Sequence, residues 1–193
     1  MSRCISPYYL LAAVLFSFNL FPAAGAPAEF GSKDNIIRDE TMIVPGLGSN
    51  GIVIGEDIDA VIRRFGKRKF RISKPSHGGE LFKNVFKIAS DTKIYFDTIY
   101  YNDEQKCAAC VFQGKVIAVI GFDANRVTKD AVNLQSGINN FIYNYGNKNM
   151  KVLRSGTNGI YMYHAMGIAL VDDDMNDSID LFVIFVPPAG KKY

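Results

Sequence analysis

An internal repeat constrains the fold of this chain more than any other feature. Apolar residues follow the spacing i, i+3, i+4, i+7 and then a glycine, which is typical of an amphipathic helix that ends at a glycine cap. The pattern occurs twice, eighty residues apart, as Ile54, Ile58, Val61, Ile62, Phe65 and Gly66, and as Leu134, Ile138, Phe141, Ile142, Tyr145 and Gly146. We therefore expect two copies of one structural unit.

Each predicted helix is followed by β-rich sequence: residues 93–101 and 111–122 in the first copy, 159–163 and 167–186 in the second. Gln113-Gly114 and the acidic stretch 172–177 are typical of hairpin turns. Residues 181–186 are apolar on both faces, which favours a strand at the centre of a sheet. The first copy is longer by residues 75–86, where His77-Gly78-Gly79 indicates a turn. The predicted fold class is α+β, with two tandem repeats, each a helix or helical pair packed on a short antiparallel β-sheet.

The N-terminus has the pattern of a secretory signal peptide. Arg3 precedes fourteen uncharged residues, 8–21, a stretch too short to cross a membrane comfortably, and small residues place cleavage between Ala24 and Ala28. We therefore predict an exported, periplasmic or extracellular protein with no transmembrane segment in the mature chain. The predicted organisation is a signal peptide at 1–26, a flexible N-terminal arm at 27–50, repeat 1 at 51–126, repeat 2 at 127–187 and a C-terminal tail at 188–193.

Four stretches together resemble a known type of exported bacterial module: 51–57, Val61, Phe65-Gly66 and 119–122. They are similar to the helix-plus-antiparallel-sheet unit found singly in the small lipoprotein of the outer-membrane barrel-assembly machine and in tandem in the β-lactamase inhibitory protein. The resemblance covers about residues 50 to 187. It implies a non-enzymatic module that binds protein or envelope surfaces. No functional residue is carried over, because the chain has neither the lipoprotein cysteine nor inhibitor-type loop residues.

Charge disfavours nucleic acid as a partner. The chain has 22 basic and 19 acidic side chains, and without Arg3 the balance is 21 against 19, or +2. Seven cations nevertheless cluster at and after the first predicted helix, and the second copy has no counterpart. We predict that this basic patch contacts an anionic partner, such as an acidic protein, lipid head groups or glycan; its members are Arg63, Arg64, Lys67, Arg68, Lys69, Arg71 and Lys74.

Cys107 and Cys110 are the sharpest chemical signal. Residues three apart on a strand point to opposite faces, with Cα atoms about 10 Å apart, so a disulfide would need a turn there. Three interpretations stay open: a local disulfide, two buried thiols, or a redox or metal function.

Other motifs match only in part. Residues 46–51 have the letters G-x-G-x-x-G but lack the helix that nucleotide binding requires, and favour a flexible loop. Residues 172–177 begin like a calcium loop, but Asp177 stands where glycine is needed and Val183 where glutamate is needed, which favours an acidic turn. His77 and His164 stand alone in the sequence. We therefore predict no metal and no cofactor.

The predicted function is an exported, non-catalytic binding module, inhibitor-like in architecture. The first alternative is a peripheral envelope factor that binds anionic lipid or glycan through the basic patch. The second is a secreted hydrolase or thiol-redox enzyme. Exposed tyrosines on the sheet would favour protein binding; the candidates are Tyr95, Tyr101, Tyr161 and Tyr163.

Overall fold

The computed structural model describes residues 33–75, 80–123 and 125–187. The predicted signal peptide, the first residues of the arm, the turn His77-Gly78-Gly79 and the C-terminal tail lie outside the described residues. Within those that are described, no helix combines the length and the apolar character needed to cross a membrane.

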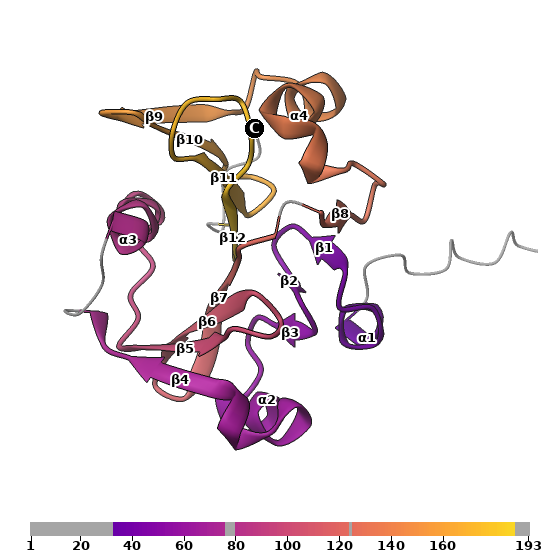
Figure 1. The fold of residues 1–193 in the computed structure, drawn as a ribbon, viewed down its shortest axis with the longest axis vertical. Coiled ribbons are helices and arrows are strands. Elements are labelled where there is room, and N and C mark those ends of the chain that lie inside the picture. Colours follow the sequence, from indigo (N-terminus) through magenta and orange to yellow (C-terminus); the bar gives the residue numbers. More distant parts are fainter. Residues whose placement is uncertain (1–32, 76–79, 124, 188–193) are drawn as a thin grey trace, which may run out of the picture. The chain divides into compact units, whose positions relative to one another are not determined.

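An eight-stranded antiparallel sheet organises the fold, with the strand order β4-β5-β6-β7-β12-β11-β10-β9 (Figure 1). Together with the helices it makes the fold mixed α+β, as the sequence predicts. The strands are β4 (Phe70–Ser73), β5 (Thr98–Asn102), β6 (Cys107–Phe112), β7 (Lys115–Gly121), β9 (Lys151–Ser155), β10 (Asn158–Tyr163), β11 (Ile168–Asp172) and β12 (Leu181–Phe185).

The strand β12 occupies the centre of this sheet, between β7 and β11. All five of its residues are buried, which confirms the central position predicted from its apolar sequence. The acidic turn leads into it from β11, and the two-residue turn Gln113-Gly114 joins β6 to β7. Both turns lie where the sequence predicts them.

Two short helices share one of the apolar clusters of the core. The helices α2 (Ile58–Phe65) and α4 (Gly137–Tyr145) end at Gly66 and Gly146, whose φ angles are 93° and 75°. Val61 and Phe141 are fully buried and pack in one cluster with inward residues of β7 and β12. The helical periodicity is therefore confirmed from Ile58 and from Ile138 to the glycine caps. The first member of each predicted pattern lies before the helix, Ile54 in a turn and Leu134 in a 3-10 turn.

A third helix, α3 (Glu80–Thr92), was not predicted and supplies residues to the other main cluster. Val85 and Ile88 are buried there with Ile120 and Val183. These neighbours alternate with Val119 and Ile184, which belong to the α2 and α4 cluster, so the two clusters lie on opposite faces of the sheet. α3 begins inside the segment 75–86, which the sequence predicts as an insertion with a turn, and extends that segment as a helix to Thr92.

Residues 33–50 correct the prediction of a flexible N-terminal arm. Ile36 and Ile43 have no exposed surface, and such burial requires ordered backbone around them. The segment contains α1 (Lys33–Arg38) and contributes strands to a second sheet, which has the order β3-β2-β1-β8. Its strands are β1 (Met42–Val44), β2 (Gly48–Ser49), β3 (Ile52–Val53) and β8 (Val127–Thr128). Outside this segment, a 3-10 turn, η1 (Lys67–Lys69), follows α2.

Candidate binding groove

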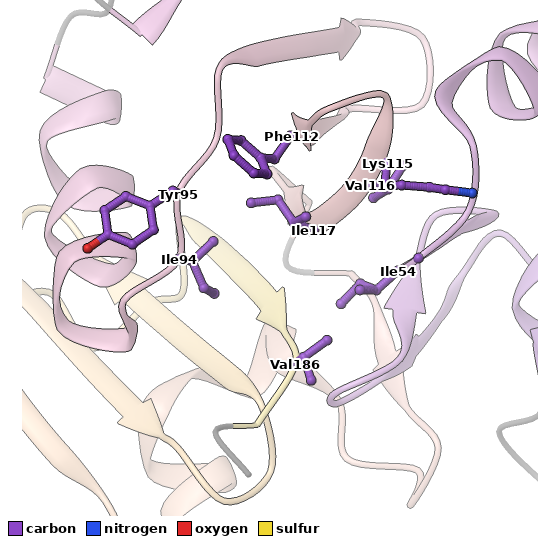
Figure 2. Close-up of a pocket in the computed structure, with 9 residues that line it drawn as sticks. Ile54, Ile94, Tyr95, Phe112, Lys115, Val116, Ile117 and Val186 are labelled. Atoms are coloured by element: carbon purple, nitrogen blue, oxygen red, sulfur yellow. The ribbon is translucent and has the colours of Figure 1, made fainter.

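An apolar groove lies where the β6–β7 hairpin, the end of β12 and the connection from α3 to β5 meet (Figure 2). Its volume is about 390 Å³, within the usual range of ligand pockets. Four separate segments contribute to its lining, and the Tyr95 ring and the Lys115 amine point outward from it (Figure 2). The lining residues are Ile54, Gly55, Ile94, Tyr95, Phe112, Lys115, Val116, Ile117 and Val186.

Backbone turns place the two aromatic residues of this groove. The end of α3 has Lys93 in the left-handed region, at φ 57°, and the Ile94 amide donates back to the Ala89 carbonyl at 2.8 Å. This helix-ending motif directs the chain into Ile94 and Tyr95. On the other side, Gln113 and Gly114 have φ angles of 49° and 77°, as a tight two-residue hairpin needs, and the strand before that turn ends at Phe112.

Three large apolar side chains of the groove are unusually exposed. Tyr95 is 76% exposed, Val186 56% and Phe112 39%. A smaller hollow of about 250 Å³ shares Ile94 and Tyr95 with the groove and continues along α3 to Phe86. Contiguous exposed apolar surface of this kind is typical of an interaction site.

The other tyrosines named from the sequence belong to the interior. Tyr101 and Tyr163 are buried and Tyr161 is half-buried, so of the four only Tyr95 is exposed. Burial raises the pKa of Tyr101 and of Tyr163 to about 12. The groove itself was missed, because its members come from segments far apart in the sequence and each is also compatible with a core position.

The basic patch divides into two groups in the structure. Arg64 pairs with Glu56 at 2.6 Å and donates to the Gly51 carbonyl, Lys69 pairs with Glu104, and Arg71 pairs with Asp103 at 3.3 Å. The remaining members are exposed and have no ion-pair partner in the described ranges: Arg63, Lys67, Arg68 and Lys74. Three cations therefore tie neighbouring segments together, and four are available to an external anion.

Cys107 and Cys110 are free thiols, buried on opposite faces of β6. Of the three interpretations, the structure has the two buried thiols. No disulfide joins them, because the strand is continuous from Cys107 to Cys110 and has no turn that would bring the two thiols together. Desolvation raises the pKa of each thiol to about 12, so both stay protonated at neutral pH, contrary to what redox or metal chemistry requires.

A polar cluster that the sequence did not reveal joins α3 to the other half of the sheet. His164 Nε2 lies 2.7 Å from Asp91 Oδ2, and Lys151 binds the other oxygen of the same carboxylate. Burial opposes ionisation of Asp91, but the hydrogen bonds from Lys151 and His164 outweigh it and keep the pKa of this carboxyl below its ordinary value. In the part of the chain that is described, no hydroxyl or thiol bonds to the His164 ring. We interpret the cluster as a structural clamp.

The acidic stretch forms a hairpin turn held by its own carboxylates. Asp172 accepts hydrogen bonds from the Asn176 and Asp177 amides, at 3.2 and 2.9 Å, and Asp180 accepts one from the Asp173 amide at 2.7 Å. One oxygen from each of Asp172, Asp174 and Asp180 lies within 4.8 Å of the others. Burial, a hydrogen bond with Asp180 and the neighbouring charges raise the pKa of Asp173.

The glycine-rich stretch 46–51 is part of a hairpin instead of the flexible loop we expected. Gly48 and Ser49 pair with Val53 and Ile52, and Asn50-Gly51 make the two-residue turn, with φ angles of 55° and 71°. Asparagine followed by glycine is a strong local signal for this turn. The helix that nucleotide binding would need does not follow it, because β3 does.

Comparison of the chain with protein-family models, curated proteins and solved structures finds no match.

Proposed function

We propose that the chain is an exported, non-catalytic binding module of the bacterial envelope or secretome, and that it holds a protein partner at the groove. The observation that carries the proposal is the cluster of exposed Tyr95, Phe112 and Val186 around an apolar hollow. Tyrosine and phenylalanine are enriched at protein interfaces, where they bury a large area at a small cost in conformational entropy.

The tandem-repeat architecture of the β-lactamase inhibitory type is part of this proposal. The strand order supports it. The strands β4 to β7 form one half of the sheet, β9 to β12 form the other, and the two halves meet where β7 pairs with β12. In each half a glycine-capped helix precedes the outermost strand. The helix α3 is an addition to the first half only, whereas the sheet β3-β2-β1-β8 takes its strand β8 from the start of the second repeat.

The chemistry of the other candidate groups supports a binding role over catalysis. Both thiols are buried and protonated, and His164 hydrogen bonds to Asp91 within a clamp that joins separate elements. The lipid or glycan alternative draws on the four unpaired cations of the basic patch, but the three paired members reduce the charge available to a membrane.

The test compares two tyrosine variants in affinity capture from the native envelope. Tyr95→Ser removes the most exposed aromatic ring of the groove, whereas Tyr143→Ser removes a ring on α4 that is 88% exposed and lies outside it. We expect the wild type and Tyr143→Ser to retain one protein partner at a fixed ratio, and Tyr95→Ser to lose most of it, since an aromatic anchor contributes about 2 kcal/mol or more.

Quantitative mass spectrometry of the bound fraction decides the outcome. Equal recovery of the partner by both variants would place the binding site elsewhere. Recovery of lipid or glycan alone would favour the basic patch. An empty capture with every form of the protein would overturn the binding-module proposal.

A further inference from the structure

The strand β4 forms one edge of the eight-stranded sheet, and its outer side has no strand partner within the described residues (Figure 1). Its four residues pair with β5, and Ile72 is 59% exposed. An edge strand with an exposed apolar side chain is a template for another strand.

The backbone of β4 indicates which groups face outward. The Phe70 amide donates to the Lys67 carbonyl in the preceding 3-10 turn, so it is not directed at β5. Since ladder bonds alternate along an antiparallel pair, the bonds to β5 then come from Arg71 and Ser73, opposite Tyr101 and Ile99. Ile72 is left with its N–H and C=O directed to the open side.

Unpaired cations flank this edge at both ends. Lys67 and Arg68 precede β4 in the 3-10 turn and Lys74 follows it; all three are exposed and lack an ion-pair partner in the described part of the chain. The other two cations nearby, Lys69 and Arg71, are held by Glu104 and Asp103. A strand with lysines on its edge repels a second copy of itself but attracts carboxylates.

We propose that the edge of β4 binds an extended acidic segment of a partner protein as an added strand. The Ile72 N–H and C=O supply the main-chain hydrogen bonds, an apolar residue of the segment covers the Ile72 side chain, and carboxylates on either side reach Lys67, Arg68 and Lys74. Main-chain bonding gives affinity in this mode of recognition, and the flanking charges give selectivity. The site is separate from the groove and does not depend on the groove's function.

The probe is a fluorescein-labelled peptide, Glu-Glu-Val-Thr-Val-Glu-Glu, measured by fluorescence anisotropy at low salt. Two peptides of the same length serve as controls: one with lysine in place of every glutamate, and one N-methylated at the three central residues, so that neither of its two edges can pair as a strand. We expect binding of the acidic peptide to weaken with salt, and both control peptides to bind at least about tenfold more weakly.

Protein variants locate the contact. Ile72→Pro removes the outward N–H and leaves the bonds to β5, because proline is tolerated on the open side of an edge strand. This variant should bind the acidic peptide about tenfold more weakly than the wild type. Arg68→Glu with Lys74→Glu should do the same, whereas Tyr95→Ser in the groove should leave peptide binding unchanged.

Equal binding of the methylated or the lysine peptide, or no saturable binding of the acidic peptide to the wild type, would overturn the proposal. The methylated peptide decides the matter on the wild-type protein if Ile72→Pro fails to fold. Loss of peptide binding in the Tyr95→Ser variant would assign the peptide to the groove instead.

Discussion

Cys107 and Cys110 show how one strand can place identical side chains in different surroundings. They are three residues apart on β6, and the alternation of the strand sends one thiol to the cluster under α2 and α4 and the other to the cluster under α3. The alternation was predictable from the spacing. The choice among the three interpretations was not, because it depended on whether the segment forms a turn.

Burial of these thiols predicts their reactivity. With each pKa raised to about 12, Cys107 and Cys110 should resist iodoacetamide at pH 8 in the folded protein and react fully in denaturant. Peptide-resolved mass spectrometry would measure the modified fraction of each cysteine. A native protein whose mass and peptides reveal a bond between Cys107 and Cys110 would contradict this expectation.

The basic patch shows the limit of residue-level prediction for the site. Its seven cations are adjacent in sequence, so the cluster itself was evident. Glu56 neutralises Arg64, and the turn of the β5–β6 hairpin supplies the carboxylates that neutralise the other two paired cations. These carboxylates, Asp103 and Glu104, lie more than thirty positions along the sequence from Arg71 and Lys69. Composition therefore predicts a charged surface, and only the fold separates structural cations from available ones.

At the scale of elements, local pattern predicted the parts whose stabilising contacts are encoded locally. The helices α2 and α4 have apolar spacing and a glycine cap, and the β6–β7 hairpin has its turn residues. In the sheet β3-β2-β1-β8, the Asn50-Gly51 turn between β2 and β3 is a local signal that we interpreted as a flexible loop. The parallel pairing of β1 with β8, which brings together Met42 and Val127, has no local signal. The segment of α3 also has helical apolar spacing, but it has no counterpart in the second copy, so the repeat pattern does not predict it.

The Asp91 clamp should contribute measurably to the docking of α3. Asp91→Asn removes a charged acceptor from Lys151 and His164, and we expect the free energy of unfolding at pH 7 to fall by about 1–3 kcal/mol. Urea denaturation would measure the loss. The substitution should accelerate amide hydrogen exchange more in α3 than in α2. Asp59→Asn, an exposed position in the first turn of α2, is the matched control and should change little.

The same clamp predicts a pH dependence with a defined sign. The pKa of Asp91 is lowered in the folded protein, so its contribution is complete well above the unfolded-state value of about 3.9. The contribution is lost as the pH falls through the lower folded-state pKa. The difference in unfolding free energy between wild type and Asp91→Asn should therefore shrink between pH 5 and about pH 3. A difference that stays constant over this range would contradict the role of the ionised carboxylate.

At the scale of the whole molecule, the pairing of β7 with β12 makes one continuous sheet from strands of the two predicted repeats, 51–126 and 127–187. At this junction Gly121 lies opposite Phe182, and the aromatic ring covers the glycine. A Cβ atom at Gly121 would lie 2.0 Å from Cζ of Phe182, far inside contact distance. The glycine is required there by the ring, which no local turn pattern would indicate.

Substitution at this junction tests whether the two halves unfold as one unit. Gly121→Ala forces the Phe182 ring out of its position and should lower the unfolding free energy by about 1–3 kcal/mol, measured by urea denaturation. In the background of Phe182→Leu, which removes the obstructing ring atoms, the same change should cost less, and the double-mutant cycle should give a coupling of about 0.5–3 kcal/mol. Because the sheet is continuous, Gly121→Ala should shift a single transition that circular dichroism and tyrosine fluorescence report alike. Additive costs in the cycle would show that the ring is not the obstacle, and two separated transitions would mean that the halves are stabilised independently.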